Sequence, residues 1–517
     1  MPVASLPDNP DLDRLKAHAK ALRDLVRAGV DGSIALVREH HPTFADLVAG
    51  STAATGFRLA DAQLTIARHY GYASWPKLRR YVELVGRLSR SPHAVPASGE
   101  LLDDDARADE LLRLACLNYG ADNPARWRAA ALLLAEHPQL AGYSIFTAAA
   151  VGDVTAARSL LDADQRLAVA EGGPFRWTPL LYLAYSRLDP TNSGVAPIGD
   201  HVAVARLLLA AGADPNAGFL WNGLPSPFTA LTGVFGRGEQ GTPPHQDELV
   251  LARLLLDAGA EANDSQTIYN RGLGDIARDD TEFLELLLDF GLGRGDGGPW
   301  RRRLGHEHQT PTEIAAEALQ HAAEAGLAER IRLLLARGVD PNVRGTHPCY
   351  ADRHPYEGAV RHGNLVVADL LAAAGAATDS VTALDRFVGA CLAGDRAAVD
   401  RLLAADPDLL PRVRAEHGNL VARSVELDRL PAVRLLVELG LDVNARHRTT
   451  ALHEAALRDN RAAVDLLLSL GADPTIVDTE HDSTPAGWAR HSGHGDLADH
   501  LDAQSAPTPA RDRLNPT

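Results

Sequence analysis

Residues 450–475 read TALHEAALRDNRAAVDLLLSLGADPT, and this stretch indicates how most of the chain folds. Thr450 is placed to cap a short helix whose apolar face includes Leu452. A second helix is expected over 461–470, and Gly471 can supply the left-handed residue that ends it. A single unit of this kind leaves apolar surface uncovered on both sides. It is stable only when copies of it stack against one another.

Copies of this unit recur upstream, each ending in a leucine-rich helix followed by glycine. These glycines are Gly212, Gly259, Gly291, Gly338, Gly375, Gly440 and Gly471, at intervals of 47, 32, 47, 37, 65 and 31 residues. The interval of 65 contains one further unit, in which Pro407 stands where the glycine would be. The underlying step is therefore about 33 residues, which predicts an array of helix pairs.

Short motifs inside the units resemble those of a known family. Thr450, Leu452, His453 and Ala455 match the pattern T-P-L-H-x-A, Thr178-Pro179-Leu180 match its start, and GADPN occupies 212–216. The chain resembles the ankyrin-repeat family over roughly three quarters of its length. The resemblance implies an all-α ankyrin-repeat solenoid of about ten to eleven helix pairs with an N-terminal helical cap. It also implies that His453 ties neighbouring repeats together by hydrogen bonds.

The same patterns divide the chain into four parts. Residues 1–86 are expected to form an N-terminal helical module, with helices over 11–29, 32–41 and twice within 58–83. Its LADAQ and SWPKL stretches resemble a module that precedes ankyrin repeats in many bacterial proteins. The module is expected to cap the first repeat, with a separate recognition domain as the alternative. A linker is expected over 87–109, the solenoid over 110–504 and a disordered tail over 505–517.

Four insertions interrupt the period. Those at 189–200 and 237–247 fall between the two helices of a unit. Those at 294–312 (the first finger) and 344–355 (the second finger) fall between units, where ankyrin proteins carry finger-like hairpins. The sequence predicts that the two fingers lie in one neighbourhood and bind a partner, because arginine forks bind carboxylate and phosphate and tryptophan can stack. The candidate residues are Trp300, Arg301, Arg302, Arg303, His306, His308, His347, Tyr350, Arg353 and His354.

Other interpretations of the fingers stay open. His306, His308, His347, Cys349 and His354 are residue types that bind zinc, but no short ligand spacing organises them. Cys349 with a nearby histidine is a candidate nucleophile. The arginine triplet can also simply pair with acidic groups of this chain. We therefore expect no cofactor, metal site or catalytic residue. The alternative is an enzyme or small-molecule binder whose pocket is built from the inserted loops.

Charge, hydropathy and cysteine content exclude several classes of function. The 517 residues carry a net charge of −17, which argues against nucleic acid or an anionic membrane as the main ligand. The sequence shows neither an apolar run long enough for a membrane span nor the apolar core of a signal peptide. Three scattered cysteines do not make a disulfide framework. We expect a cytoplasmic, non-catalytic scaffold that binds an unidentified protein partner through its concave groove and its extended fingers.

Overall fold

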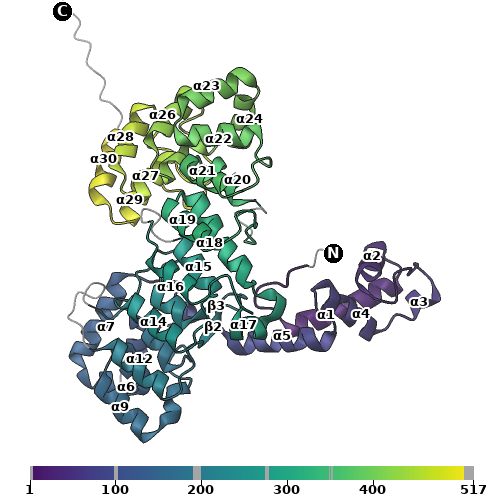
Figure 1. Ribbon diagram of the computed structural model, residues 1–517, viewed down its shortest axis with the longest axis vertical. Helices are drawn as coiled ribbons and strands as arrows, with labels where there is room; N and C mark the ends of the chain where they lie inside the picture. The colour runs from purple at the N-terminus through teal and green to yellow at the C-terminus, as the bar shows by residue number, and fades with distance from the viewer. Residues whose placement is uncertain are drawn as a thin grey trace, which may run out of the picture. The chain divides into compact units, whose positions relative to one another are not determined.

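The computed structural model describes residues 4–97, 103–189, 199–273, 279–347, 350 and 353–505 (Figure 1). The chain is mostly helical, as the sequence predicts. It divides into two compact units, 1–318 and 319–517, and the division falls inside α18 (Pro311–Ala325). The single array expected over 110–504 is therefore described as parts of two units. None of the described helices combines the length and the apolar character that a membrane span requires.

The N-terminal module of the first unit contains the helices that the sequence predicts, together with a short helix over Thr52–Thr55 that it does not predict. They are α1 (Leu12–Arg27), α2 (Asp31–His40), α3 (Thr52–Thr55), α4 (Leu59–His69) and α5 (Trp75–Leu88). Asp11 caps α1, since its carboxylate accepts hydrogen bonds from the backbone of Asp13 and Arg14. One face of α1 is buried through Leu15, Ala19, Leu22 and Val26. This 3.6-residue period is what packs α1 against α2 and α4.

A small sheet follows the module and departs from the all-α expectation. Strand β1 (Ser89–Arg90) pairs in parallel with β2 (Gly218–Trp221), which pairs antiparallel with β3 (Pro227–Thr229). The segment 87–109, expected to be a linker, thus contains the end of α5, β1, η1 (Pro92–Ala94) and the start of α6. Asn222-Gly223 in the β2–β3 loop is a hairpin signal, and both residues have positive φ. That signal was present in the sequence and was missed.

Helix pairs make up most of the rest of the first unit. Their first helices pack in the order α6 (Asp104–Ala115), α8 (Ile145–Val151), α10 (Pro179–Tyr185), α13 (Ala230–Phe235) and α15 (Ser265–Leu273). Their second helices are α7 (Pro124–Glu136), α9 (Val154–Ala163), α12 (His201–Ala210), α14 (Glu248–Asp257) and α16 (Glu282–Asp289). Two 3-10 turns, η2 (Pro138–Gly142) and η3 (Gln165–Val169), follow α7 and α9. Consecutive pairs thus pack against one another, as the repeat period predicts.

The second unit continues the pattern. After the end of α18 it contains α19 (Ala328–Ala336), α20 (Pro355–Arg361), α21 (Leu365–Ala373), α22 (Ala383–Ala393), α23 (Arg396–Ala405), α24 (Leu409–Glu416), α25 (Leu420–Glu426), α26 (Leu430–Glu438), α27 (Ala451–Leu457), α28 (Arg461–Ser469), α29 (Pro485–His491) and α30 (Gly495–Ser505). One buried apolar core extends from Leu384 to Leu501. Helix α24 begins two residues after Pro407, where the other repeats have an extended loop.

Two local predictions from residues 450–475 are confirmed. Gly471 has φ 91°, the left-handed conformation that ends α28. The Nε2–H of buried His453 donates to the carbonyl of Ser483, 3.0 Å away in the next repeat. Its Nδ1 therefore accepts from the Thr450 hydroxyl at 2.8 Å. Burial lowers the pKa of His453, which keeps the ring neutral for this double role.

Candidate functional site

The first finger does not form a free hairpin. Residues Gly298–Leu304 form helix α17, followed by the turn η4 (Gly305–Glu307). Trp300 is only 4% exposed, and its indole Nε1–H donates to the carbonyl of Asn216 at 3.0 Å. The expectation that Trp300 presents its ring to a partner is therefore corrected, because the ring is already packed inside the first unit.

The core that contains Trp300 belongs mainly to the N-terminal module. Its buried residues come from α1 to α5 and the loops between them, together with Leu220 of β2 and with Trp300 and Leu304 of α17. Among the described residues, no side chain of α6 or α7 belongs to this core. The module therefore packs on the β2 and α17 region, whereas the sequence led us to expect it on the first helix pair.

The three arginines of α17 have partners within the chain. The Arg301 guanidinium donates to the carbonyl of His308, and Arg302 donates to the carboxylate of Asp296 at 2.7 Å. The Arg303 guanidinium lies over the Trp300 ring, 5.1 Å from its centroid. The structure thus matches the reading in which the arginines pair with groups of this chain. Exposed pairs of this kind contribute little stability, so Arg302, at 59% exposure, is still accessible to a partner.

The histidines of the first finger face the module or the interior. His306 packs edge-on against Tyr72, with the ring centroids 4.7 Å apart, and the Tyr72 hydroxyl donates to Glu307 at 3.0 Å. Burial and the nearby Glu307 carboxylate raise the pKa of Tyr72. His308 is buried, which lowers its pKa, and its Nδ1–H donates to the carbonyl of Gln309. The first finger therefore contacts the chain's own N-terminal module.

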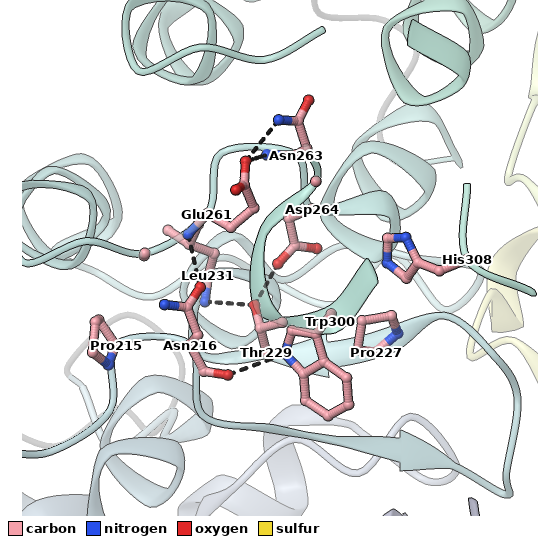
Figure 2. Close-up of a pocket in the computed structure, with 12 residues that line it drawn as sticks. Pro215, Asn216, Pro227, Thr229, Leu231, Glu261, Asn263, Asp264, Trp300 and His308 are labelled. Carbon is pink, nitrogen blue, oxygen red and sulfur yellow. Dashed lines mark hydrogen bonds between the residues drawn. The ribbon is translucent and has the colours of Figure 1, made fainter. Parts of the chain in front are cut away.

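A small, mostly apolar cavity lies beside Trp300 and His308 (Figure 2). Asp264 is buried at its edge and accepts hydrogen bonds from the hydroxyls of Thr229 and Thr232. Burial is the main reason why the pKa of Asp264 is raised. The cavity has a volume of about 10 Å³, which admits about one water molecule. It is too small for a substrate.

The second finger lies in the second unit, where its described residues pack on α18. Tyr350 is buried, and its hydroxyl lies 2.6 Å from Nδ1 of His321. Burial, with smaller effects of nearby cationic groups, lowers the pKa of His321 to about 3. Arg353 donates to Glu324 at 3.1 Å, and His354 donates through Nδ1 to the carbonyl of Asn342.

Several alternatives depended on residues of the second finger. Cys349, the candidate nucleophile and metal ligand, lies outside the described residues. The ring of His347 lies 6.0 Å from that of Tyr350. Within the part of the chain that the structure describes, no three His, Cys, Asp or Glu side chains are placed to hold a metal ion. Because the fingers fall in different units, each is a separate candidate surface.

The insertion at 237–247 is held by a residue that the sequence analysis missed. Arg187 is fully buried and donates to the carbonyl of Pro243 at 2.8 Å and to that of Gly233 at 2.6 Å. Burial lowers the pKa of its guanidinium. An arginine next to the apolar run PLLYLAY was the available signal. Most of the insertion at 189–200 lies outside the described residues.

Short stacked helix pairs, in which a buried histidine joins one pair to the next, define a helical repeat protein. Residues 387–478 match the family model for ankyrin repeats (3 copies). This part of the chain therefore consists of ankyrin repeats, as the motif at 450–455 predicts.

Comparison with curated proteins agrees with this assignment. The chain is 31% identical over 113 residues to the palmitoyltransferase Hip14 of Drosophila melanogaster, covering 20% of this chain and 18% of that protein. It is 39% identical over 64 residues to a putative ankyrin repeat protein of fowlpox virus (12% and 10%). It is 35% identical over 99 residues to one of Acanthamoeba polyphaga mimivirus (19% and 13%). The chain spans between 10% and 18% of the length of these relatives, so their activities do not pass to it.

Proposed function

We propose that this chain is a non-catalytic scaffold that binds another protein through its ankyrin repeats. The observation that carries the proposal is the match of residues 387–478 to ankyrin repeats, a family that generally mediates protein–protein interaction. We further propose that the stack extends beyond that match, as a solenoid of about ten to eleven helix pairs over 110–504. The ordered packing of first helices in the first unit supports this extension.

The loop tips between repeats of the second unit are the best supported binding surface. Arg446, His447 and Arg448 are exposed at the tip between α26 and α27. The backbone N–H of Thr479, in the next tip, donates to the carbonyl of Arg448 at 3.0 Å. The Arg446 guanidinium donates to the carbonyl of Val477 at 3.0 Å. Tips tied together in this way lose little conformational freedom on binding, which favours affinity.

The exposed residues of the first finger stay a prediction of the same kind. Arg302 and His306 keep 59% and 49% of their side-chain surface exposed. Trp300, His308 and Tyr350 are buried and are expected to act only by holding the fingers in place. The loop tips of the second unit and the first finger are thus two separable candidate surfaces.

Charge reversal at the tips tests the proposal. We expect the double variant Arg446→Glu/Arg448→Glu to lose protein partners that proximity labelling and cross-linking find for the parent chain. The matched control is Arg396→Glu/Arg461→Glu, which reverses two exposed arginines on the second helices α23 and α28. A second variant, Arg302→Ala/His306→Ala, tests the first finger. Each partner must then bind the purified parent chain directly.

The outcomes separate the possibilities. Loss of binding in the tip variant alone, with an unchanged thermal transition, supports the repeat tips as the surface. Loss in the finger variant alone assigns binding to the first finger. Equal binding by all variants would overturn both surfaces. A chain that turns over or retains a metabolite and binds no protein would replace the scaffold by the enzyme alternative.

A further inference from the structure

The N-terminal module contains a cavity of about 150 Å³ that is partly open to solvent. Residues of α1, α2 and α4 line it, and these three helices pack against one another (Figure 1). Leu22, Leu36 and Ile66, one from each helix, supply apolar walls. An apolar cavity of about 150 Å³ is large enough to hold benzene. The space therefore suits a ring-sized molecule, in contrast to the one-water cavity beside Trp300.

Polar groups converge on the same cavity. His18, Ser33, His69 and Tyr70 all line it. Within the described residues, neither the Ser33 hydroxyl nor the Tyr70 hydroxyl has a side-chain or backbone hydrogen-bond partner. A few polar groups in a mostly apolar pocket are typical of small-molecule sites, where they fix the orientation of the ligand.

His69 is hydrogen-bonded to His40 through one ring nitrogen, so only its other ring nitrogen can bind a ligand. Nδ1 of His69 lies 3.1 Å from Nε2 of His40, and one of the two nitrogens must donate its proton to the other. Burial and, next, the neighbouring His40 lower the pKa of His69, so the ring is neutral near pH 7. Nε2 of His69 is the nitrogen left over. It donates or accepts according to which way the His40 bond runs, and a hydroxyl group can satisfy either state.

We propose that this cavity binds a small neutral molecule with an apolar ring and one hydroxyl group, of the phenol class. The ring replaces water against Leu22, Leu36 and Ile66, and the hydroxyl bonds to Tyr70, with His69 or Ser33 as a second partner. Neutral partners suit a neutral hydroxyl, because a buried carboxylate would need a charged partner to offset its desolvation. The site is independent of the protein-binding function proposed above.

Methyl NMR of the full-length chain tests this site. With isoleucine δ1 methyls labelled, 4-methylphenol is expected to shift the Ile66 signal saturably, whereas isoleucines outside the module do not move. Toluene has the same ring and no hydroxyl. It is expected to bind about five-fold more weakly or worse, as the loss of one or two hydrogen bonds implies. Tyr70→Phe is expected to weaken 4-methylphenol and leave toluene unchanged.

A pair of alanine variants on α1 supplies the control. Ala21 and Ala17 are both exposed and lie one turn apart on the same helix, but only Ala21 lines the cavity. Ala21→Leu is expected to fill the space and abolish the Ile66 shift, and Ala17→Leu is expected to leave it intact. An Ile66 signal that 4-methylphenol does not move at concentrations up to about 10 mM would overturn the site. Equal binding of toluene and 4-methylphenol would overturn the hydroxyl recognition.

Discussion

The indole Nε1–H of Trp300 and the carbonyl oxygen of Asn216 are 3.0 Å apart, although 84 positions separate the two residues in the chain. This bond joins the first finger to the loop before β2 inside the core of the N-terminal module. A residue that looked like a binding anchor in the sequence is thus a structural one. Its substitution should affect stability before it affects any partner.

We expect Trp300→Ala to destabilise the first unit by about 3 to 5 kcal/mol, as for other buried aromatic truncations. Trp300→Phe keeps most of the volume and loses the bond to Asn216, at a cost of about 1 to 3 kcal/mol. Arg302→Ala is the surface control and should stay within about 0.5 kcal/mol of the parent. Chemical denaturation measures all three. A Trp300→Ala chain as stable as the parent would contradict the buried position.

The contact between Tyr72 and Glu307 gives a second test. Tyr72→Phe removes the hydroxyl that donates to Glu307, and we expect a loss of about 1 kcal/mol together with faster amide exchange in α1 to α5. Glu307→Gln keeps an acceptor oxygen and should retain more of the protection than Glu307→Ala. If all three variants exchange like the parent, the first finger does not hold the module.

A substitution in the repeat core of the second unit should destabilise mainly the repeats next to it. Leu467 is fully buried, so Leu467→Ala is expected to cost about 2 to 5 kcal/mol. Leu365, 42% exposed on α21 of the same unit, provides a matched leucine-to-alanine control with little effect. In a linear array the loss is felt mostly by neighbouring repeats. Hydrogen exchange that accelerates equally along the whole chain would count against the array.

Low pH should lower the stability of the first unit, because two of its histidines are buried in the neutral form. Burial lowers the pKa values of His201 and His245 below their ordinary 6.5, and their rings are 4.8 Å apart. The unfolded chain then binds protons that the folded chain does not. Stability is therefore full above about pH 6.5 and falls as the pH drops toward the folded pKa values, by up to about 1.4 kcal/mol per pH unit for each histidine.

Glutamine variants measure this effect. His201→Gln keeps an amide donor for the carbonyl of Ala150 and removes one titrating group. We expect unfolding midpoints in denaturant to fall less steeply between pH 6.5 and 5 for His201→Gln than for the parent, and least for His201→Gln/His245→Gln. At pH 8 the histidines are neutral in both the folded and the unfolded chain, so stabilities measured there give the cost of the substitutions themselves. If stability falls equally with pH in the parent and in both variants, these histidines do not cause the loss of stability in acid.

Local sequence signals predicted much of the fold correctly. The end of α28 before Gly471, the position of Thr450 as the N-cap residue of α27 and the bridging role of His453 each depend on residues a few positions apart or one repeat apart. Such features follow from backbone conformation and from hydrogen bonds that are set within one repeat period. The candidate site in the two fingers was harder to predict, because the sequence of an inserted segment does not tell which other segments pack against it.

The sequence by itself determined that this chain builds helix pairs with a period of about 33 residues, since that period is written in the spacing of apolar residues and turn glycines. Only the tertiary structure decided that Trp300 is buried, that β1 pairs with β2, and that Arg187 holds the insertion at 237–247. Each of these joins segments far apart in the chain, and burial depends on which distant surfaces meet. No periodic pattern records that choice.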